Sequence, residues 1–121
     1  MIKQITRDEL VRIKESGEKF KLVDVLPRDN FEKEHIHGAI SLPLADIEKK
    51  AAKLLKKDEK IVVYCASFEC KASTMAAEKL IGLGYKDVLD YKGGLKDYKE
   101  GGLNLEGRLH EETCASCCSC D

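Results

Sequence analysis

Residues 61–64 read Ile-Val-Val-Tyr and form a continuous apolar run. An unbroken run is typical of a β-strand that is buried on both faces, whereas a strand with one face in water alternates apolar and polar residues. A strand of this kind needs other strands beside it and helices above and below it. The run therefore predicts an α/β fold in which a parallel sheet is covered by helices on both faces.

Other segments supply the remaining elements of such a fold. Short strands are predicted at residues 22–25 and 87–91, and helical spacing of apolar residues predicts helices over 44–55, 76–83 and 95–99. Because strands and helices alternate through short connections, the strands are expected to be parallel. Functional sites in such sheets lie at the carboxyl ends of the strands.

The first helix carries a clear start signal. Thr6 and Glu9 match a capping box, in which each side chain bonds the backbone amide of the other residue. Gly17 supplies a stop signal near the far end. A helix is therefore expected to begin directly after Thr6.

The size and charge of the chain limit its organisation and its partners. A length of 121 residues suits one domain, predicted over residues 1–105, and residues 106–121 are predicted to be a flexible cysteine-rich tail. The 21 basic residues are interspersed with 22 acidic ones, so we expect no nucleic-acid partner. No apolar stretch approaches the roughly 20 residues of a membrane span and the start resembles no secretion signal, so we expect a cytoplasmic protein without a membrane partner. No pattern specifies an oligomeric state.

The distribution of the six cysteines argues against a disulfide framework. Four of them, Cys114, Cys117, Cys118 and Cys120, lie close together near the end of the sequence, while Cys65 and Cys70 share one short loop. Thiols clustered in this way in an intracellular chain are more often catalytic or metal-binding.

The predicted site is the loop that follows the strand at residues 61–64. Cys65 leaves this strand, and the next helix is expected to begin near Ser73. Backbone amides of such a loop, together with the positive end of the helix dipole, lower a thiol's pKa and stabilise a terminal sulfur anion. Cys65 is thus a candidate nucleophile; the alternative is a small buried residue that closes the strand. The candidate loop comprises Cys65, Ala66, Ser67, Phe68, Glu69, Cys70, Lys71, Ala72 and Ser73.

Segments along the chain together resemble the rhodanese family over residues 4–105. They are residues 22–25, Phe31, residues 35–40, 42–44, 62–65 and 91–95. The resemblance implies a five-stranded parallel sheet, a nucleophilic Cys65 and an active-site loop from Cys65 to Ser73. It also implies a sulfurtransferase that moves sulfane sulfur from a small donor, such as thiosulfate or a persulfide (including a protein persulfide), to a thiol or cyanide through a Cys65 persulfide. No cofactor is required for this chemistry.

The loop also departs from the family pattern. It contains no glycine, it is longer than usual, and Cys70 stands where an arginine is common. Asp24 is followed by Val25-Leu26, and Arg28 comes two residues later, so an Asp24–Arg28 pair is predicted to brace the loop. His35 and His37 are expected to shape the segment before Gly38, and not to bind metal.

Two residues of the loop leave alternatives open. Cys70 is a candidate to attack a Cys65 persulfide and form a disulfide, or it fills a small apolar space. Lys71 is a candidate partner for a bound sulfur anion, or a solvated side chain. The spacing Cys65-x5-Lys71 is similar to the Cys-x5-Arg loop of dual-specificity phosphatases with a rhodanese fold. Phosphatase or arsenate reductase activity ranks lower, because lysine lacks the bidentate grip of arginine and Glu69 would repel a dianion.

Three interpretations of the tail, residues 106–121, stay open. Its four cysteines are candidate ligands for zinc or copper(I), candidate thiols of a relay that accepts sulfur from Cys65, or part of a disordered segment. If Cys65 and Cys70 act only as a redox pair, the chain is instead a non-catalytic redox or metal-binding module on the same scaffold.

Overall fold

A five-stranded parallel sheet forms the centre of the computed structural model, which describes residues 3–107. Across the sheet the order is β1 (Lys3–Ile5), β6 (Asp87–Tyr91), β5 (Lys60–Tyr64), β2 (Phe20–Asp24) and β4 (Ile40–Ser41). Every neighbouring pair in this order is parallel. The predicted α/β class and the five-stranded parallel sheet are therefore confirmed.

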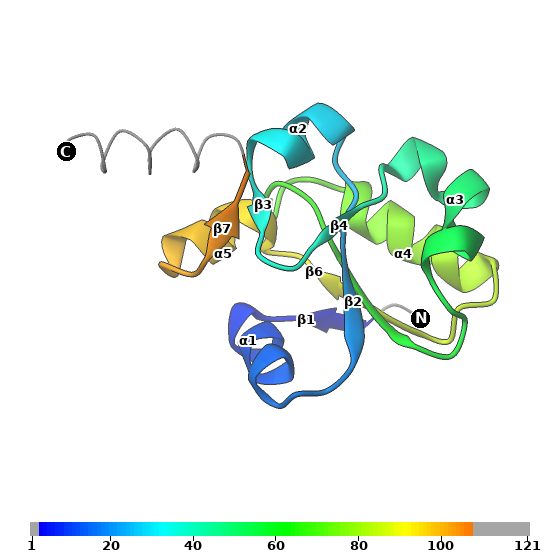
Figure 1. Ribbon diagram of the computed structural model, residues 1–121, viewed down its shortest axis with the longest axis horizontal. Coiled ribbons are helices and arrows are strands. Elements are labelled where there is room, and N and C mark those ends of the chain that lie inside the picture. The colour runs from blue at the N-terminus through cyan, green and yellow to red at the C-terminus, as the bar shows by residue number, and fades with distance from the viewer. Residues whose placement is uncertain (1–2, 108–121) are drawn as a thin grey trace.

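Helices cover both faces of the sheet (Figure 1). On one face, α3 (Ile47–Leu54) and α4 (Ala72–Gly82) pack over Ile61 and Val63 of β5. On the other face, the cluster formed by α1 (Arg7–Glu15) and α5 (Gly94–Glu100) contains Val62 and Tyr64 of the same strand. All four of these β5 residues are fully buried, which explains why the strand is apolar without alternation.

Local signals in the sequence place several boundaries. The capping box of α1 is present, since the Thr6 amide donates to Glu9 Oε1 at 2.9 Å and the Glu9 amide donates to Thr6 Oγ1 at 3.2 Å. The predicted strand at 87–91 coincides with β6. The predicted helix at 44–55 begins as a short 3-10 helix, Leu44–Asp46, and becomes α-helical at Ile47.

The sequence pattern does not indicate several short elements. These are β1, α2 (Arg28–Lys33) and a two-stranded antiparallel sheet of β3 (His35–Ile36) and β7 (Leu105–Glu106). Each is too short to show a period, and each depends on a partner that is distant in the sequence.

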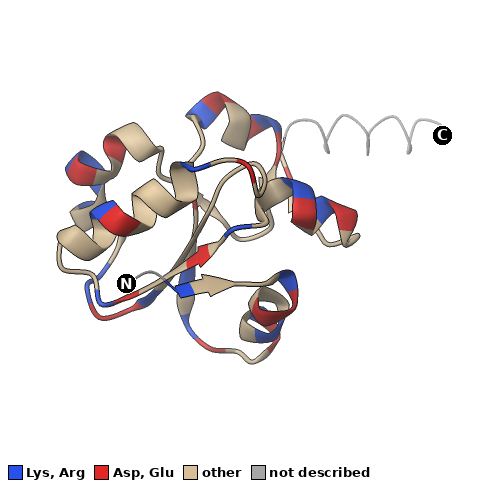
Figure 2. Ribbon diagram, turned by 180° about the vertical axis from the view of Figure 1, so that it is seen from behind, with Lys and Arg blue, Asp and Glu red and all other residues tan. Residues whose placement is uncertain are grey.

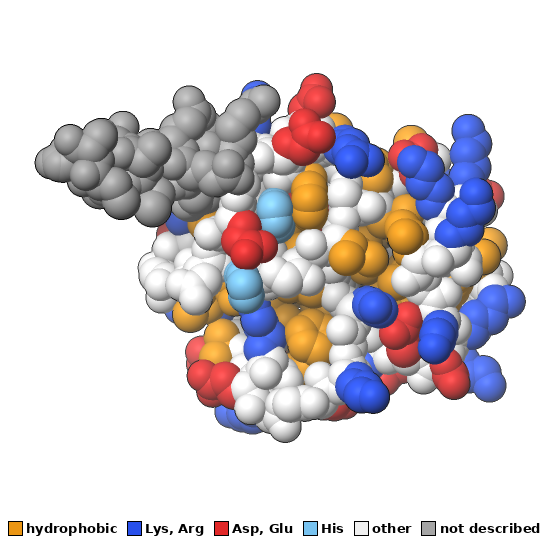
Figure 3. All heavy atoms as spheres, in the orientation of Figure 1, with side chains coloured by type: hydrophobic (Ala, Val, Ile, Leu, Met, Phe, Trp, Pro, Cys, Tyr) orange, Lys and Arg blue, Asp and Glu red, His pale blue; other side chains and the backbone are white. Residues whose placement is uncertain are grey.

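His35 and His37, the two histidines before Gly38, connect the β3 segment to β7 through Glu106. His37 Nδ1 lies 2.7 Å from Glu106 Oε2, and His35 Nε2 lies 3.4 Å from Glu106 Oε1. Figure 3 shows both described histidines on one face of the molecule beside acidic side chains. Glu106 therefore contacts the folded part of the chain, one residue beyond the boundary predicted from the sequence.

The predicted ion pair between Asp24 and Arg28 is wrong. Asp24 is fully buried and accepts hydrogen bonds from the Leu26 amide at 2.8 Å and the Tyr64 hydroxyl at 2.9 Å. Arg28 begins α2, which directs its guanidinium into solvent, where it pairs with Glu32 at 3.4 Å. Tyr64 also accepts a bond from the Ile36 amide, so the buried network joins β2, β5 and β3.

The described surface carries charged side chains of both signs (Figure 2 and Figure 3). Basic and acidic residues are mixed along the helices seen in Figure 2. None of the helices within residues 3–107 combines the length and apolar character that crossing a membrane would require.

The Asp24 carboxyl predicts a distinctive dependence of stability on pH. Burial raises its pKa from 3.8 to about 6, although the bonds from Leu26 and Tyr64 oppose this. The folded protein then holds a proton that the unfolded chain has lost, so this contribution to stability is present below pH 3.8 and disappears as pH rises through about 6. Between pH 4.5 and 7 we expect wild type to lose about 2 kcal/mol of unfolding free energy from this group.

Urea unfolding of wild type and Asp24→Asn at several pH values measures this loss. The stability difference between the two proteins should shift in favour of Asp24→Asn as pH rises. Asp29→Asn removes an exposed carboxyl of α2 and serves as the matched control. Parallel pH curves for wild type and Asp24→Asn would contradict the assignment.

Candidate active site

Cys65 is the first residue after β5 and lies at the carboxyl end of the sheet. Its side chain is fully buried, in the cluster beneath α4 that also contains Val63 and Ala76. A short loop then leads to α4, which begins at Ala72. The alternation along β5 turns Cys65 toward α4, so its sulfur lies near the N-terminus of that helix.

The segment after β6 holds the loop in place. The amides of Leu95 and Lys96 donate to the carbonyl oxygens of Cys65 and Ala66 at 2.9 and 2.8 Å. Lys92 Nζ donates to the Cys70 carbonyl at 2.6 Å. These bonds engage three loop carbonyls on the side of β6 and α5 and leave the neighbouring amides available to the sulfurs.

Gly94 makes this close approach possible. Its φ is +67°, and a β-carbon added there would lie 2.5 Å from the Cys65 carbonyl oxygen. Among the amino acids, only glycine tolerates both this positive φ and so short an approach.

The two cysteines of the loop interact directly. Both are free thiols, and Cys70 packs against the core cluster that contains Cys65. Burial is the main cause that raises the pKa of the Cys65 thiol, and hydrogen bonding to Cys70 raises it further. The Ser73 amide and hydroxyl oppose this rise.

Cys70 has the opposite electrostatic environment. Its partial burial on its own raises the pKa of the thiol. Hydrogen bonds from the Cys65 thiol and from the amides of Ala66 and Ala72 outweigh burial and lower this pKa below its ordinary value. The positive charge of Lys92 acts in the same direction. Within the pair, the pKa of Cys70 is therefore lowered and the pKa of Cys65 is raised.

The expectation that the loop lowers the pKa of Cys65 is wrong for this resting pair. The loop does provide inward-facing amides, as the sequence predicts, but two of them face Cys70. The thiol of Cys65 remains on the buried side of the pair, where desolvation disfavours its ionised form.

The other loop residues form its outer rim. The Cys70 amide donates to the Ser67 carbonyl at 3.1 Å, which closes a turn with Phe68 and Glu69 at its tip. Phe68 is 63% exposed, and Glu69 and Lys71 are exposed as well. Ser73, in contrast, is fully buried, and apart from its interaction with the Cys65 sulfur its hydroxyl has no hydrogen-bond partner among the described residues.

Lys92 is a functional candidate that the sequence reasoning missed. The expected cation was Lys71, which is exposed, whereas the charge that acts on Cys70 belongs to Lys92. A signal was present, since Lys92 precedes the glycine pair after a predicted strand, at the same carboxyl edge as Cys65.

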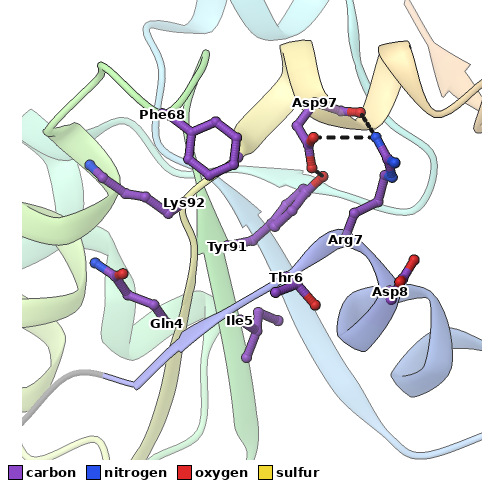
Figure 4. A pocket seen from close by; sticks show the side chains of 10 residues that line it. Gln4, Ile5, Thr6, Arg7, Asp8, Phe68, Tyr91, Lys92 and Asp97 are labelled. Atoms are coloured by element: carbon purple, nitrogen blue, oxygen red, sulfur yellow. Dashed lines mark hydrogen bonds and ion pairs between the residues drawn. The ribbon is translucent and has the colours of Figure 1, made fainter.

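A hollow of about 480 Å³ lies beside the loop (Figure 4). Phe68 and Lys92 line one side, and Arg7 from the start of α1 lines another. Its wall is rigid, because Asp97 accepts hydrogen bonds from Tyr91 Oη at 2.7 Å and from Arg7 Nη1 at 3.2 Å. The hollow offers space for an organic molecule next to the tip of the loop.

The predicted metal ligands Cys114, Cys117, Cys118 and Cys120 lie outside the described residues. Within residues 3–107 no group of three or more His, Cys, Asp or Glu side chains could hold a metal ion.

Comparison with known proteins identifies relatives over most of the sequence. Residues 6–101 match the family model described as the rhodanese-like domain. The chain is 34% identical over 102 residues to the HTH-type transcriptional regulator Rv0324 of Mycobacterium tuberculosis, which covers 84% of this chain and 44% of the regulator. It is 34% identical over 76 residues to the thiosulfate sulfurtransferase PspE of Escherichia coli, which covers 62% of this chain and 70% of PspE.

A solved structure shows the same fold. The rhodanese-like domain of the Alr3790 protein from Anabaena superimposes with a TM-score of 0.81 at 32% identity, over 91% of this chain and 83% of that domain. The chain spans about half the length of the first curated relatives that it matches.

The thiol pair predicts an order of alkylation. When the reduced chain is treated with limiting iodoacetamide at neutral pH, Cys70 should react several times faster than Cys65, because its pKa is lowered and its side chain is less buried. Cys70→Ser should accelerate alkylation of Cys65 and lower the pH midpoint of that reaction. Fragmentation of the tryptic peptide 61–71 separates the two positions. Faster labelling of Cys65 in wild type would reverse the assignment.

Gly94→Ala should destabilise the fold by more than about 2 kcal/mol, because the methyl group clashes with the Cys65 carbonyl in addition to the cost of positive φ. Gly102→Ala is the matched control, since Gly102 has φ +72° with nothing within 4 Å of an added β-carbon. It should cost only about 1 kcal/mol. Thermal unfolding measures both, and equal losses would show that the contact with Cys65 contributes nothing.

Proposed function

Since this chain belongs to the rhodanese-like domain family, we propose that it is a sulfurtransferase that carries sulfane sulfur as a persulfide on Cys65. Its donor is thiosulfate or a persulfide, and its acceptor is a thiol or cyanide. The reaction requires no cofactor, because the sulfur is held covalently by the protein.

The position of Cys65 between β5 and the N-terminus of α4 is the observation that carries this proposal. The Ser73 amide belongs to the first turn of α4 and faces the Cys65 sulfur. Apart from its interaction with the Cys65 sulfur, the buried Ser73 hydroxyl has no partner among the described residues, so it can donate to an additional sulfur atom on Cys65. Donors aimed at a developing sulfur anion stabilise it in a water-poor site.

The proposed reaction has two half-reactions. In the first, the Cys65 thiolate attacks the outer sulfur of thiosulfate; a sulfur–sulfur bond to Cys65 forms, the bond within thiosulfate breaks, and sulfite leaves with the electron pair. In the second, an acceptor thiolate or cyanide attacks the outer sulfur of the persulfide, and the Cys65 thiolate is restored. Because Cys65 is buried in the resting structure, the loop has to shift for a donor to reach it.

The raised pKa of Cys65 is compatible with this role. A smaller fraction of the thiol is ionised, but the thiolate that forms is intrinsically more nucleophilic than one of lower pKa. A reducing compartment such as the cytoplasm would keep both loop thiols free. The hollow beside Phe68 is proposed to receive the body of an organic thiol acceptor.

Substitution of the nucleophile tests the proposal. Cys65→Ser should reduce thiosulfate-to-cyanide turnover by roughly three orders of magnitude or more, since no other group replaces a covalent carrier. Mass spectrometry of peptide 61–71 from Cys70→Ser, in which Cys65 is the only cysteine of that peptide, should show one added sulfur after incubation with thiosulfate. The added sulfur should be absent when Cys65 is also replaced by serine. Cys114→Ser, which removes a cysteine far along the sequence from the loop, is the control and should keep wild-type turnover with cyanide.

Near-wild-type turnover by a folded Cys65→Ser protein would exclude the mechanism. If folded wild type and Cys70→Ser neither acquire sulfur nor release hydrosulfide with thiosulfate or a low-molecular-weight persulfide, the non-catalytic module becomes the better description.

A further inference from the structure

A second thiol stands next to the proposed carrier and has no role in the transfer described above. Cys70 packs against the buried cluster that contains Cys65, and its amide bonds the Ser67 carbonyl, the same carbonyl that lies 3.9 Å from the Cys65 sulfur. Its side chain is only partly buried. Its carbonyl is held by Lys92 at 2.6 Å. Space filling alone does not explain why the amides of Ala66 and Ala72 and the charge of Lys92 act on this thiol.

We propose that Cys70 is a resolving thiol, which discharges the Cys65 persulfide as hydrosulfide and leaves a Cys65–Cys70 disulfide. The activity rests on the proposed function, because it requires sulfur on Cys65. It gives the loop a second outcome, sulfane-sulfur reduction, whenever no external acceptor takes the sulfur first.

The step balances without an outside reagent. The Cys70 thiolate attacks the inner sulfur, which is Cys65 Sγ; the Cys70–Cys65 bond forms and the bond between Cys65 and the outer sulfur breaks. The outer sulfur departs with the electron pair and its proton as hydrosulfide. Formally, the sulfur of Cys70 is oxidised and the outer sulfur is reduced.

The resting structure favours this direction of attack. The amides of Ala66 and Ala72 and the charge of Lys92 lower the pKa of Cys70 and so favour its thiolate, which is the attacking species. The Cys65 sulfur is deeper and shielded from solvent, which makes an external thiol less able to reach the inner sulfur than Cys70 is.

Restoring the dithiol requires a reductant. Two low-molecular-weight thiols, or one dithiol, would reduce the Cys65–Cys70 disulfide and leave as their own disulfide. The overall reaction of thiosulfate with a dithiol then yields sulfite, hydrosulfide and the oxidised dithiol.

The sequence allows the pair to be followed apart from the other cysteines. Cleavage after Lys60 and Lys71 releases residues 61–71 with both loop cysteines, and cleavage after Arg108 releases residues 109–121 with the other four. An internal disulfide lowers the mass of the first peptide by two hydrogens, a retained persulfide adds one sulfur, and a cross-link joins the two peptides.

The experiment gives the reduced, full-length chain excess thiosulfate without oxygen or added thiol, and then measures hydrosulfide and both peptides. Wild type should release close to one hydrosulfide per chain and form the 61–71 disulfide. Cys70→Ser should keep the added sulfur on Cys65 and release at least tenfold less hydrosulfide until a dithiol is supplied. Circular dichroism and thermal unfolding verify that the variant is folded.

The outcomes separate the two proposals. A persulfide that persists in wild type as it does in Cys70→Ser would overturn the resolving role and leave the sulfurtransferase intact. Added sulfur on Cys70, or a cross-link between the two peptides, would also overturn it, in favour of a relay. If neither wild type nor Cys70→Ser acquires sulfur on Cys65 or releases hydrosulfide from thiosulfate, the proposed function itself fails.

Discussion

The burial of β5 on both faces is the constraint on which the rest of the molecule depends. The strand pairs with β2 on one side and β6 on the other, and its alternating side chains enter two separate clusters. A slip by one residue would exchange these clusters and turn Cys65 away from α4. The register of β5 therefore determines on which side of the sheet the Cys65 sulfur lies. The position of the site thus depends on a strand that is buried on both faces.

The loop after β5 is shaped mainly by backbone bonds. Its carbonyls are engaged by amides at the start of α5 and by Lys92, so its own amides remain available for sulfur. Gly94 permits this contact because no side chain could occupy the space beside the Cys65 carbonyl. Two thiols then compete for one small set of donors, and Cys70, which has better access to amides and charge, is the one whose pKa is lowered.

This competition relates structure to chemistry. A single cysteine in such a loop would receive all of its donors, whereas here Cys65 is the more basic and more deeply buried thiol of a pair. The arrangement suits a carrier that reacts strongly once ionised, next to a neighbour with a lowered pKa whose thiolate forms more readily. Transfer to an acceptor and discharge as hydrosulfide then become alternative fates of the same persulfide.

Much of this could be predicted from the sequence, and for physical reasons. The apolar run at 61–64 and the capping box at Thr6 are local patterns, so the sequence by itself determined the parallel sheet, the start of α1 and the place of Cys65 at a strand end. It did not single out the partner of Asp24 or the cation beside Cys70. Those depend on Tyr64 and Lys92, which only the packing of β5 and β6 brings near. Tertiary structure alone decided which thiol has the lowered pKa, because desolvation and amide direction are properties of the folded loop and not of its sequence.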